Sequence, residues 1–223
     1  MKHVTSSRIR EIDALAREKY GIPSIALMEN AGSSLASEIV LYFRKRHRPI
    51  GVCAFFCGKG NNGGDGFVAA RHLASMGAGC VIYLLFQESG MRAGDALTNL
   101  AAAKKMGIPV KNAWSVKAVT ALKREIPKYG AVVDAIFGTG FRGAPSGHVK
   151  SVIDIINTAR CPVFSVDVPS GLDATTGRAE AFIRADVTVT FGLPKKGFLL
   201  GKGPGAAGRV SVRNISYPRG LLR

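Results

Sequence analysis

The sequence is short of acidic residues, with 15 Asp and Glu against 31 Lys and Arg and a formal net charge of +16 at pH 7. This balance suits either a soluble basic protein or a protein with an anionic partner, such as a dinucleotide or a nucleic acid. The basic residues cluster at 44–48 and 195–202, without a long basic tail or interleaved aromatic residues. The pattern therefore does not favour nucleic-acid binding.

Cysteine and histidine are scarce, with four residues of each. No C-x-x-C pair or histidine cluster predicts a zinc site. The sequence also lacks the apolar segment of a signal peptide and any apolar run of the ~18 residues that span a bilayer. We therefore expect a cytoplasmic protein without a membrane segment. Its cysteines are expected to be buried free thiols, since they lie in or beside apolar runs, at Cys53, Cys57, Cys80 and Cys161.

The 223 residues instead show alternating strand-like and helix-like patterns. Helical patterns occupy 5–20, 23–46, 92–106 and 115–123, and one more helix is expected after each of two glycine-rich turns at 58–66 and 138–143. Apolar runs predict strands at 52–57, 78–86, 108–111, 131–137, 161–168, 186–191 and 208–215. This alternation predicts one α/β domain over residues 1–223. We expect a Rossmann-like three-layer sandwich, with a mostly parallel central sheet and helices on both faces.

The chain is organised around the stretch at 51–72, GVCAFFCGKGNNGGDGFVAARH. A buried strand runs into a glycine-rich turn and then a helix, which presents unpaired backbone N–H groups to an anion such as a phosphate. Asn61, Asn62 and Asp65 add amide and carboxylate groups to this turn. A phosphate does not need the negative charge of Asp65, which indicates a cation, a ribose hydroxyl or a proton nearby.

The G-x-G-x-x-G pattern at 58–63 also matches the dinucleotide fingerprint of dehydrogenases. An acidic residue at the end of the next strand would strengthen that match, but Glu88 lies about two residues too late. The Asn-Asn-Gly-Gly-Asp insertion is not needed for hydride transfer. An ordinary dehydrogenase is therefore disfavoured.

Ligands of parallel sheets bind beyond the carboxyl ends of the strands. The turn at 58–66 and the ends of the strands at 131–137 and 161–168 point to that same edge. Polar residues from these distant segments are therefore expected to converge on one site. They are Asn62, Asp65, Asp134, Asp167 and Ser170.

Two of these carboxylates have informative surroundings. Asp134 lies within an apolar strand, so it must be ion-paired, hydrogen-bonded or bound to a cation. The oxygen donors of Asn62 and Ser170, nearby by topology, favour a hard cation over a structural ion pair. A single carboxylate beside neutral oxygens favours a monovalent ion over magnesium. Asp167 closes a strand between two valines, a partly desolvated position that suits proton transfer, although a turn-forming aspartate would fit there too. Ser170 has neither a G-x-S-x-G elbow nor a histidine to make it a nucleophile.

Five motifs in order along the chain resemble the YjeF N-terminal family. They are M-E-N-A-G at 28–32, C-G-K-G-N-N-G-G-D-G at 57–66, V-D-A-I-F-G-T-G-F at 133–141, V-D-V-P-S-G-L-D at 166–173 and T-F-G-L-P-K-K-G at 190–197. The resemblance implies a Rossmann-like isomerase that interconverts the R and S epimers at C6 of hydrated NADH and NADPH, called NADHX and NADPHX. It also implies one potassium ion per subunit and a homodimer. We expect a single YjeF N-terminal-like domain without a fused dehydratase domain, and therefore a dehydratase on a separate protein.

Carried over by motif, the resemblance makes Asp167 the catalytic residue, which would donate a proton to the C6 hydroxyl and recover it. It makes Asn62, Asp134 and Ser170 potassium ligands. With Asp167, it implies substrate binding by Asn61, Asn62, Gly63, Gly64, Asp65, Gly138, Thr139, Gly140, Phe141, Arg142, Gly143 and Ala144. The preference between NADHX and NADPHX stays open, as do the roles of Lys195 and of Glu29 and Asn30, which either face a pocket or lie on a solvated helical turn.

A rival hypothesis is a non-catalytic scaffold. Some eukaryotic relatives of this fold are dimerisation modules of RNA-decay factors, and the net charge of +16 leaves room for RNA binding. Such modules need not keep the polar site, whereas Asn62, Asp134, Asp167 and Ser170 are all present here.

Overall fold

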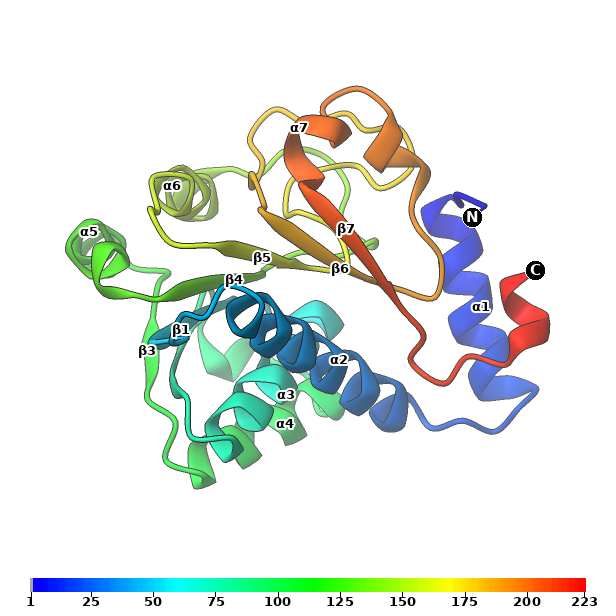
Figure 1. The fold of residues 1–223 in the computed structure, drawn as a ribbon, viewed down its shortest axis with the longest axis horizontal. Helices are drawn as coiled ribbons and strands as arrows, with labels where there is room; N and C mark the ends of the chain where they lie inside the picture. Colours follow the sequence, from blue (N-terminus) through cyan, green and yellow to red (C-terminus); the bar gives the residue numbers. More distant parts are fainter. Residues whose placement is uncertain (1) are drawn as a thin grey trace.

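The computed structural model describes residues 2–223, and a seven-stranded sheet forms its centre (Figure 1). The strands are β1 (Val52–Cys57), β2 (Gly79–Leu84), β3 (Val110–Asn112), β4 (Ala131–Ala135), β5 (Val163–Val166), β6 (Val187–Phe191) and β7 (Arg209–Arg213). All neighbouring pairs run parallel, in the order β3-β2-β1-β4-β5-β6-β7. The chain builds the sheet from β1 to one edge and then returns to the other side of β1. The strand order therefore reverses between β1 and β4, where parallel sheets bind their ligands.

Helices cover both faces of the sheet, which confirms the predicted layered sandwich. The α-helices are α1 (Ser6–Glu18), α2 (Ser24–Arg44), α3 (Asn61–Ser75), α4 (Asp95–Lys105), α5 (Val116–Glu125), α6 (Gly147–Ile156) and α7 (Gly203–Ala207). The 3₁₀ helices are η1 (Glu88–Gly90), η2 (Ile126–Lys128), η3 (Lys196–Leu199) and η4 (Arg219–Leu222). Residues 2–223 contain no helix long and apolar enough to cross a bilayer.

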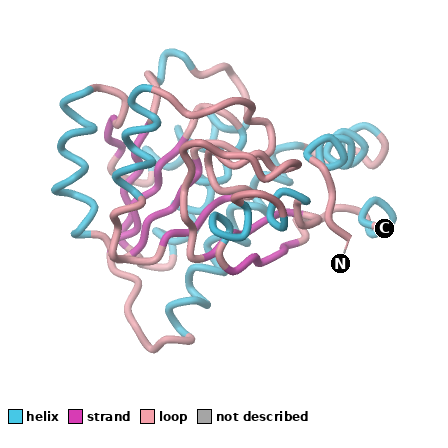
Figure 2. Tube along the Cα trace, turned by 90° about the horizontal axis from the view of Figure 1, so that it is seen from above, coloured by secondary structure: helices cyan, strands magenta, loops and turns pink. Residues whose placement is uncertain are grey.

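Strand side chains alternate between two hydrophobic cores because successive residues point to opposite faces. Phe55 and Val133 belong to the core shared with α1–α4, whereas Phe56 and Val132 belong to the core shared with α5 and α6. Figure 2 shows the strands fanned between these helical layers, and both views place the two ends of the chain at the same side of the molecule.

The largest difference from the sequence prediction is the start of α3. We expected the turn to extend through residue 66, but the helix begins at Asn61, and Asp65 already lies within it. The glycines serve close packing instead of turn conformation. A Cβ on Gly63 would lie 1.8 Å from the Gly58 carbonyl oxygen, and a Cβ on Gly66 would lie 2.6 Å from the Ala135 Cβ. Glycine therefore lets α3 pack directly against the ends of β1 and β4.

Candidate functional site

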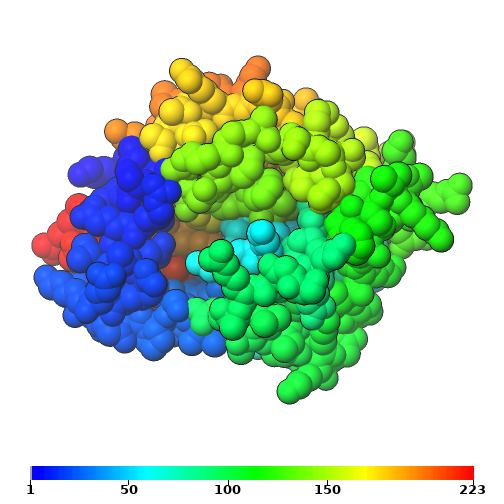
Figure 3. Space-filling view, turned by 180° about the vertical axis from the view of Figure 1, so that it is seen from behind, coloured from blue at the N-terminus to red at the C-terminus, as the bar shows by residue number. Residues whose placement is uncertain are grey.

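A cavity of about 730 Å³ opens beyond the carboxyl ends of the central strands. Its walls come from α1, α2, the start of α3, the loop after β4, the ends of β5 and β6, and residues 215–217. Figure 3 shows this hollow between the blue N-terminal helix and the green and cyan segments. The volume is typical of pockets that bury a small ligand or cofactor.

The structure brings most of the predicted substrate-binding residues to this cavity. Those that line it are Asn61, Asn62, Asp65, Gly138, Thr139, Gly140, Phe141, Arg142 and Asp167. Six other predicted site residues lie outside the lining, namely Gly63, Gly64, Asp134, Gly143, Ala144 and Ser170. Glu29 and Asn30 do not face the cavity either. Glu29 accepts hydrogen bonds from Arg71 and from His72, and Asn30 donates to the Ile215 carbonyl.

The N-terminus of α3 presents free backbone donors to the cavity. Gly60 is the N-cap and supplies no side-chain hydrogen bond, and the Gly64 N–H makes the first helical bond, to the Gly60 carbonyl. The N–H groups of Asn61, Asn62 and Gly63 therefore have no partner within the helix. Such a helix start attracts an anion through these donors and through the helix dipole.

Asp167 is held in an unusual backbone conformation at the end of β5. Its φ of 61° lies in the left-handed region, which aspartate tolerates better than most residues but which still costs free energy. Only 8% of the residue is exposed. Its Oδ1 atom accepts hydrogen bonds from Lys195 Nζ at 2.5 Å, Thr190 Oγ1 at 3.2 Å and the Phe191 N–H at 3.4 Å. Its Oδ2 atom accepts none from residues 2–223, so one oxygen is anchored and the other is free.

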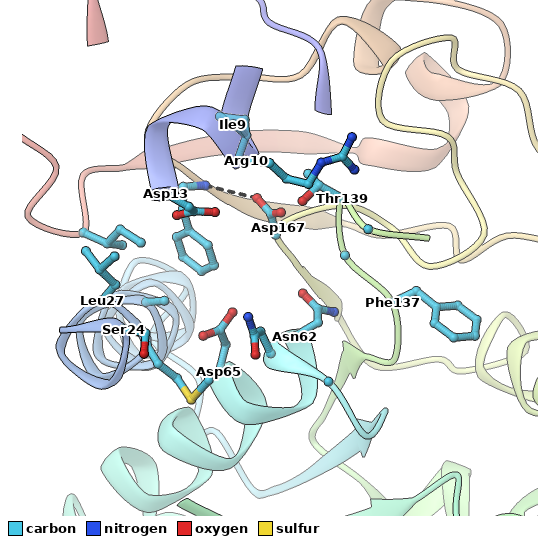
Figure 4. Close-up of a pocket in the computed structure, with 18 of the residues that line it drawn as sticks. Ile9, Arg10, Asp13, Ser24, Leu27, Asn62, Asp65, Phe137, Thr139 and Asp167 are labelled. Atoms are coloured by element: carbon cyan, nitrogen blue, oxygen red, sulfur yellow. Dashed lines mark hydrogen bonds between the residues drawn. The ribbon is translucent and has the colours of Figure 1, made fainter. Parts of the chain in front are cut away.

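Asp65 faces Asp167 from the opposite wall of the cavity (Figure 4). The half-buried Asp65 carboxyl receives no hydrogen bond from a protein side chain or N–H group within the described part of the chain. Burial, and after it the charges of Asp167 and Asp13, raises the pKa of Asp65 well above its usual value. Burial also raises the pKa of Asp13, against the hydrogen bond that the Tyr217 hydroxyl donates to it. One cavity therefore holds an anchored carboxylate beside a carboxyl group that favours its protonated form.

Asp134 lies behind the cavity and is fully buried. Its Oδ1 accepts from Ser170 Oγ at 2.5 Å and the Ile136 N–H at 3.3 Å, and its Oδ2 accepts from Ser165 Oγ and the Ser170 N–H, both at 2.8 Å. Burial raises the pKa of Asp134, and these hydrogen bonds oppose that rise. The carboxyl group thus joins β4, β5 and the turn after β5.

The Asn62 carboxamide, which lines the cavity, is not satisfied in this way. Its Nδ2 atom is buried without a hydrogen-bond partner among residues 2–223, and its Oδ1 would lie 2.9 Å from a Cβ on Gly138. The orientation of a carboxamide is assigned from its partners, so an unpartnered buried amide fits an oxygen donor to a cation equally well. No group of three His, Cys, Asp or Glu side chains in 2–223 could hold a metal. Carboxamide, hydroxyl and carboxylate oxygens are the kinds of donor that a hard cation accepts.

A model of the family described as "YjeF-related protein N-terminus" matches residues 24–197. This chain belongs to that family. It is 35% identical to the NAD(P)H-hydrate epimerase of Elusimicrobium minutum, over all of this chain and 99% of the relative. It is 43% identical to the bifunctional NAD(P)H-hydrate repair enzyme Nnr of Moorella thermoacetica, over 98% of this chain but only 41% of that enzyme. A crystal structure of the yeast protein ynu0 shares the fold, with a TM-score of 0.79 and 28% identity over 96% of this chain and 88% of that one.

Asp13 and Tyr217 line the cavity, and Lys195 contacts Asp167 without lining it, yet none of the three had a role predicted from the sequence. Asp13 comes from α1 and Tyr217 from the C-terminal segment, both beyond the YjeF family match, and Lys195 lies near its end. Lys195 had a sequence signal, since it is a lysine in the largely apolar run from Phe191 to Phe198. Asp13 had none, because an acidic residue on an amphipathic helix is normally exposed to solvent.

Arg142 reaches the cavity mainly to hold its loop. Its guanidinium donates to the carbonyls of Thr139 and Phe141 and to Ser6 Oγ at the start of α1. These bonds connect the glycine-rich loop after β4 to the N-terminal helix. In this member of the YjeF family, α1 is thereby built into the wall of the site.

Proposed function

We propose that this protein is an NAD(P)H-hydrate epimerase, an isomerase that interconverts the R and S epimers at C6 of hydrated NADH and NADPH. The names of its full-length relatives support this activity. The observation that carries the proposal is the pair of carboxyl groups, Asp167 and Asp65, on opposite walls of one cavity. Inversion at a carbon needs groups that can act on both faces of the ring, and this arrangement supplies them.

The reaction balances as a loss and return of water. One carboxylic acid protonates the C6 hydroxyl, the C6–O bond breaks, and water leaves. The ring nitrogen lends its electron pair and forms a conjugated iminium. A carboxylate on the other face then removes a proton from an incoming water as the new C6–O bond forms. Asp167 already accepts a hydrogen bond from an ammonium group, which favours the base role for Asp167 and the acid role for Asp65. The prediction that Asp167 alone donates and recovers the proton remains the alternative to this division of roles.

The rest of the cavity suits a dinucleotide. The free N–H groups at the start of α3 would bind a phosphate. Arg10, Arg17 and Lys59 also line the cavity and add positive charge. These contacts would fix the position of the nicotinamide ring and thereby lower the entropic part of the barrier.

We further propose a potassium ion, one per subunit, held by Asn62, Asp134 and Ser170. When bound, it would supply positive charge that offsets the charge of the Asp134 carboxylate. We also propose a cytoplasmic homodimer whose S product is used by a dehydratase. The bifunctional relatives are named as repair enzymes, which supports such a coupling.

The deciding experiment is a chiral assay on the R epimer of NADPHX. Wild-type protein should form the S epimer much faster than buffer alone. Asp167→Asn keeps the shape of the side chain but loses the base, so we expect kcat to fall by about 10²–10⁴-fold. The control is Asp154→Asn, an exposed residue of α6 paired with Lys150, which should keep full activity. Wild-type turnover no faster than buffer, or near-normal turnover by Asp167→Asn, would reject the proposal.

A further inference from the structure

Lys195 is a fully buried lysine, with none of its surface exposed. Lysine is almost never buried to this extent unless it is paired. Its Nζ atom donates to Asp167 Oδ1 at 2.5 Å, to Thr190 Oγ1 at 2.6 Å and to the Phe191 carbonyl at 3.1 Å. An ammonium group has three protons, so all of its donors are used within the protein. Lys195 does not line the cavity. It therefore acts on a bound ligand only through its partners.

The backbone around Lys195 is also fixed. Residue 195 forms a parallel bridge with Val4, in which the Val4 N–H donates to the Pro194 carbonyl at 2.9 Å and the Lys196 N–H donates to the Val4 carbonyl at 2.8 Å. The stem of the lysine is thus held before its ammonium group meets Asp167. A group anchored at both ends loses little conformational freedom when it makes an ion pair.

We propose that Lys195 is a positioning residue for the epimerase, a role that rests on the proposed function. It clamps Oδ1 of Asp167, keeps this carboxyl group an acceptor, and leaves Oδ2 as the single oxygen that faces the substrate. Two features support a functional purpose over a purely structural one. Asp167 adopts a left-handed backbone conformation, which presents its side chain at the cavity. A buried ion pair is also poor at adding stability, because desolvation offsets its attraction.

The test begins with Lys195→Met, which keeps most of the length of the side chain and removes its charge. With Asp167 no longer clamped, we expect kcat to fall by about 10²-fold or more while KM changes by less than threefold. The matched control is Lys196→Met, because Lys196 is the next residue, is exposed, and makes no side-chain hydrogen bond within the described chain. Lys195→Met that folds and keeps kcat within twofold of wild type would overturn the proposal.

A double-mutant cycle keeps the proposal testable if Lys195→Met does not fold. The double variant Lys195→Met/Asp167→Asn buries no unpaired charge. If the lysine acts through Asp167, the double variant is as slow as Asp167→Asn alone, within twofold. A double variant more than tenfold slower than Asp167→Asn would show that Lys195 serves the reaction in another way. Absence of epimerisation by the wild-type protein would instead reject the proposed function itself.

Discussion

Among single residues, proton transfer depends on which carboxyl group keeps its proton. Asp65 and Asp167 lie in one cavity, but only Asp167 has an ammonium partner. Two carboxylates near each other rarely ionise together, because the second charge is resisted by the first. The ammonium of Lys195 donates a hydrogen bond to Asp167, whereas burial raises the pKa of Asp65. Asp65 is therefore expected to carry the proton that is given to the leaving hydroxyl.

Asp65→Asn should lower kcat by about 10²-fold or more and leave KM within a few fold, because the amide cannot give up a proton. The raised pKa of Asp65 sets the pH dependence. In wild type, kcat/KM should fall as the pH rises through that value, since the acid form is lost. The residual activity of Asp65→Asn should not show this alkaline decline. The measurement is kcat and KM from pH 5.5 to 9. A variant with unchanged kcat and a raised KM would mean that Asp65 only binds the substrate.

The sequence predicts those site residues that come shortly after the carboxyl end of a strand. The ends of parallel strands meet at one edge of the sheet, which predicts that Asn62, Asp65 and Asp167 lie near one another. Lys195 and Asp13 could not be placed on the site in this way. Their partners, Asp167 and Tyr217, lie 28 and 204 residues away, and only the packing of α1 and of the turn after β6 brings them together.

Between elements, one buried carboxylate joins α2 to the edge strand β7. Glu38 accepts hydrogen bonds from Arg209 at 2.5 Å, from Ser211 Oγ at 3.0 Å and from Arg213. Burial raises the pKa of Glu38, but these three donors outweigh it and lower the value to about 2. The folded-state pKa lies below the unfolded value of about 4.3. Its stabilisation is therefore complete above that pH and is lost as the pH falls toward about 2.

Glu38→Gln should destabilise the protein by roughly 2 kcal/mol at pH 7, a value reduced for solvent screening because both arginines are about half exposed. The difference from wild type should shrink between about pH 5 and pH 2. Urea unfolding at several pH values measures it. Glu11→Gln removes an exposed pair with Arg8 and should cost less than about 0.5 kcal/mol. A Glu38→Gln penalty that stays constant down to pH 2 would contradict the assignment.

The elements themselves were largely predictable. All seven strands form where apolar β-rich runs occur. In the five inner strands, burial on both faces of the parallel sheet leaves a continuous apolar signal. The predicted start of α3 was wrong because glycine has poor helix propensity, and the first turns of this helix contain Gly63, Gly64 and Gly66. Contacts with β1, β4 and α2 override that preference, since only glycine fits so close to the Gly58 carbonyl, Met28 and Ala135. Contacts of this kind, between segments far apart in the sequence, cannot be predicted from a local sequence pattern.

At the level of the whole molecule, the proposed potassium ion should act as a ligand of the folded state. A ligand that binds only the folded state at 100 times its Kd adds about 2.7 kcal/mol of stability. For a domain of this size, such a gain raises Tm by roughly 5–10 °C. Thermal unfolding in potassium chloride should therefore occur at a higher temperature than in choline chloride at equal ionic strength. This readout is independent of catalysis.

Asn62→Ala supplies the matched comparison, because it removes a carboxamide whose buried nitrogen has no hydrogen-bond partner among residues 2–223. The variant should lose most of the potassium-dependent rise in Tm, whatever its own baseline stability. Asp154→Asn, which removes an exposed carboxylate of α6 paired with Lys150, should keep the full rise. A rise in Tm of equal size in sodium, potassium and choline salts would indicate a general salt effect. The chain has a net charge of +16, and any salt weakens the repulsion between its positive charges. That result would reject the proposed potassium site, and Asn62 would then remain only a predicted substrate-binding residue.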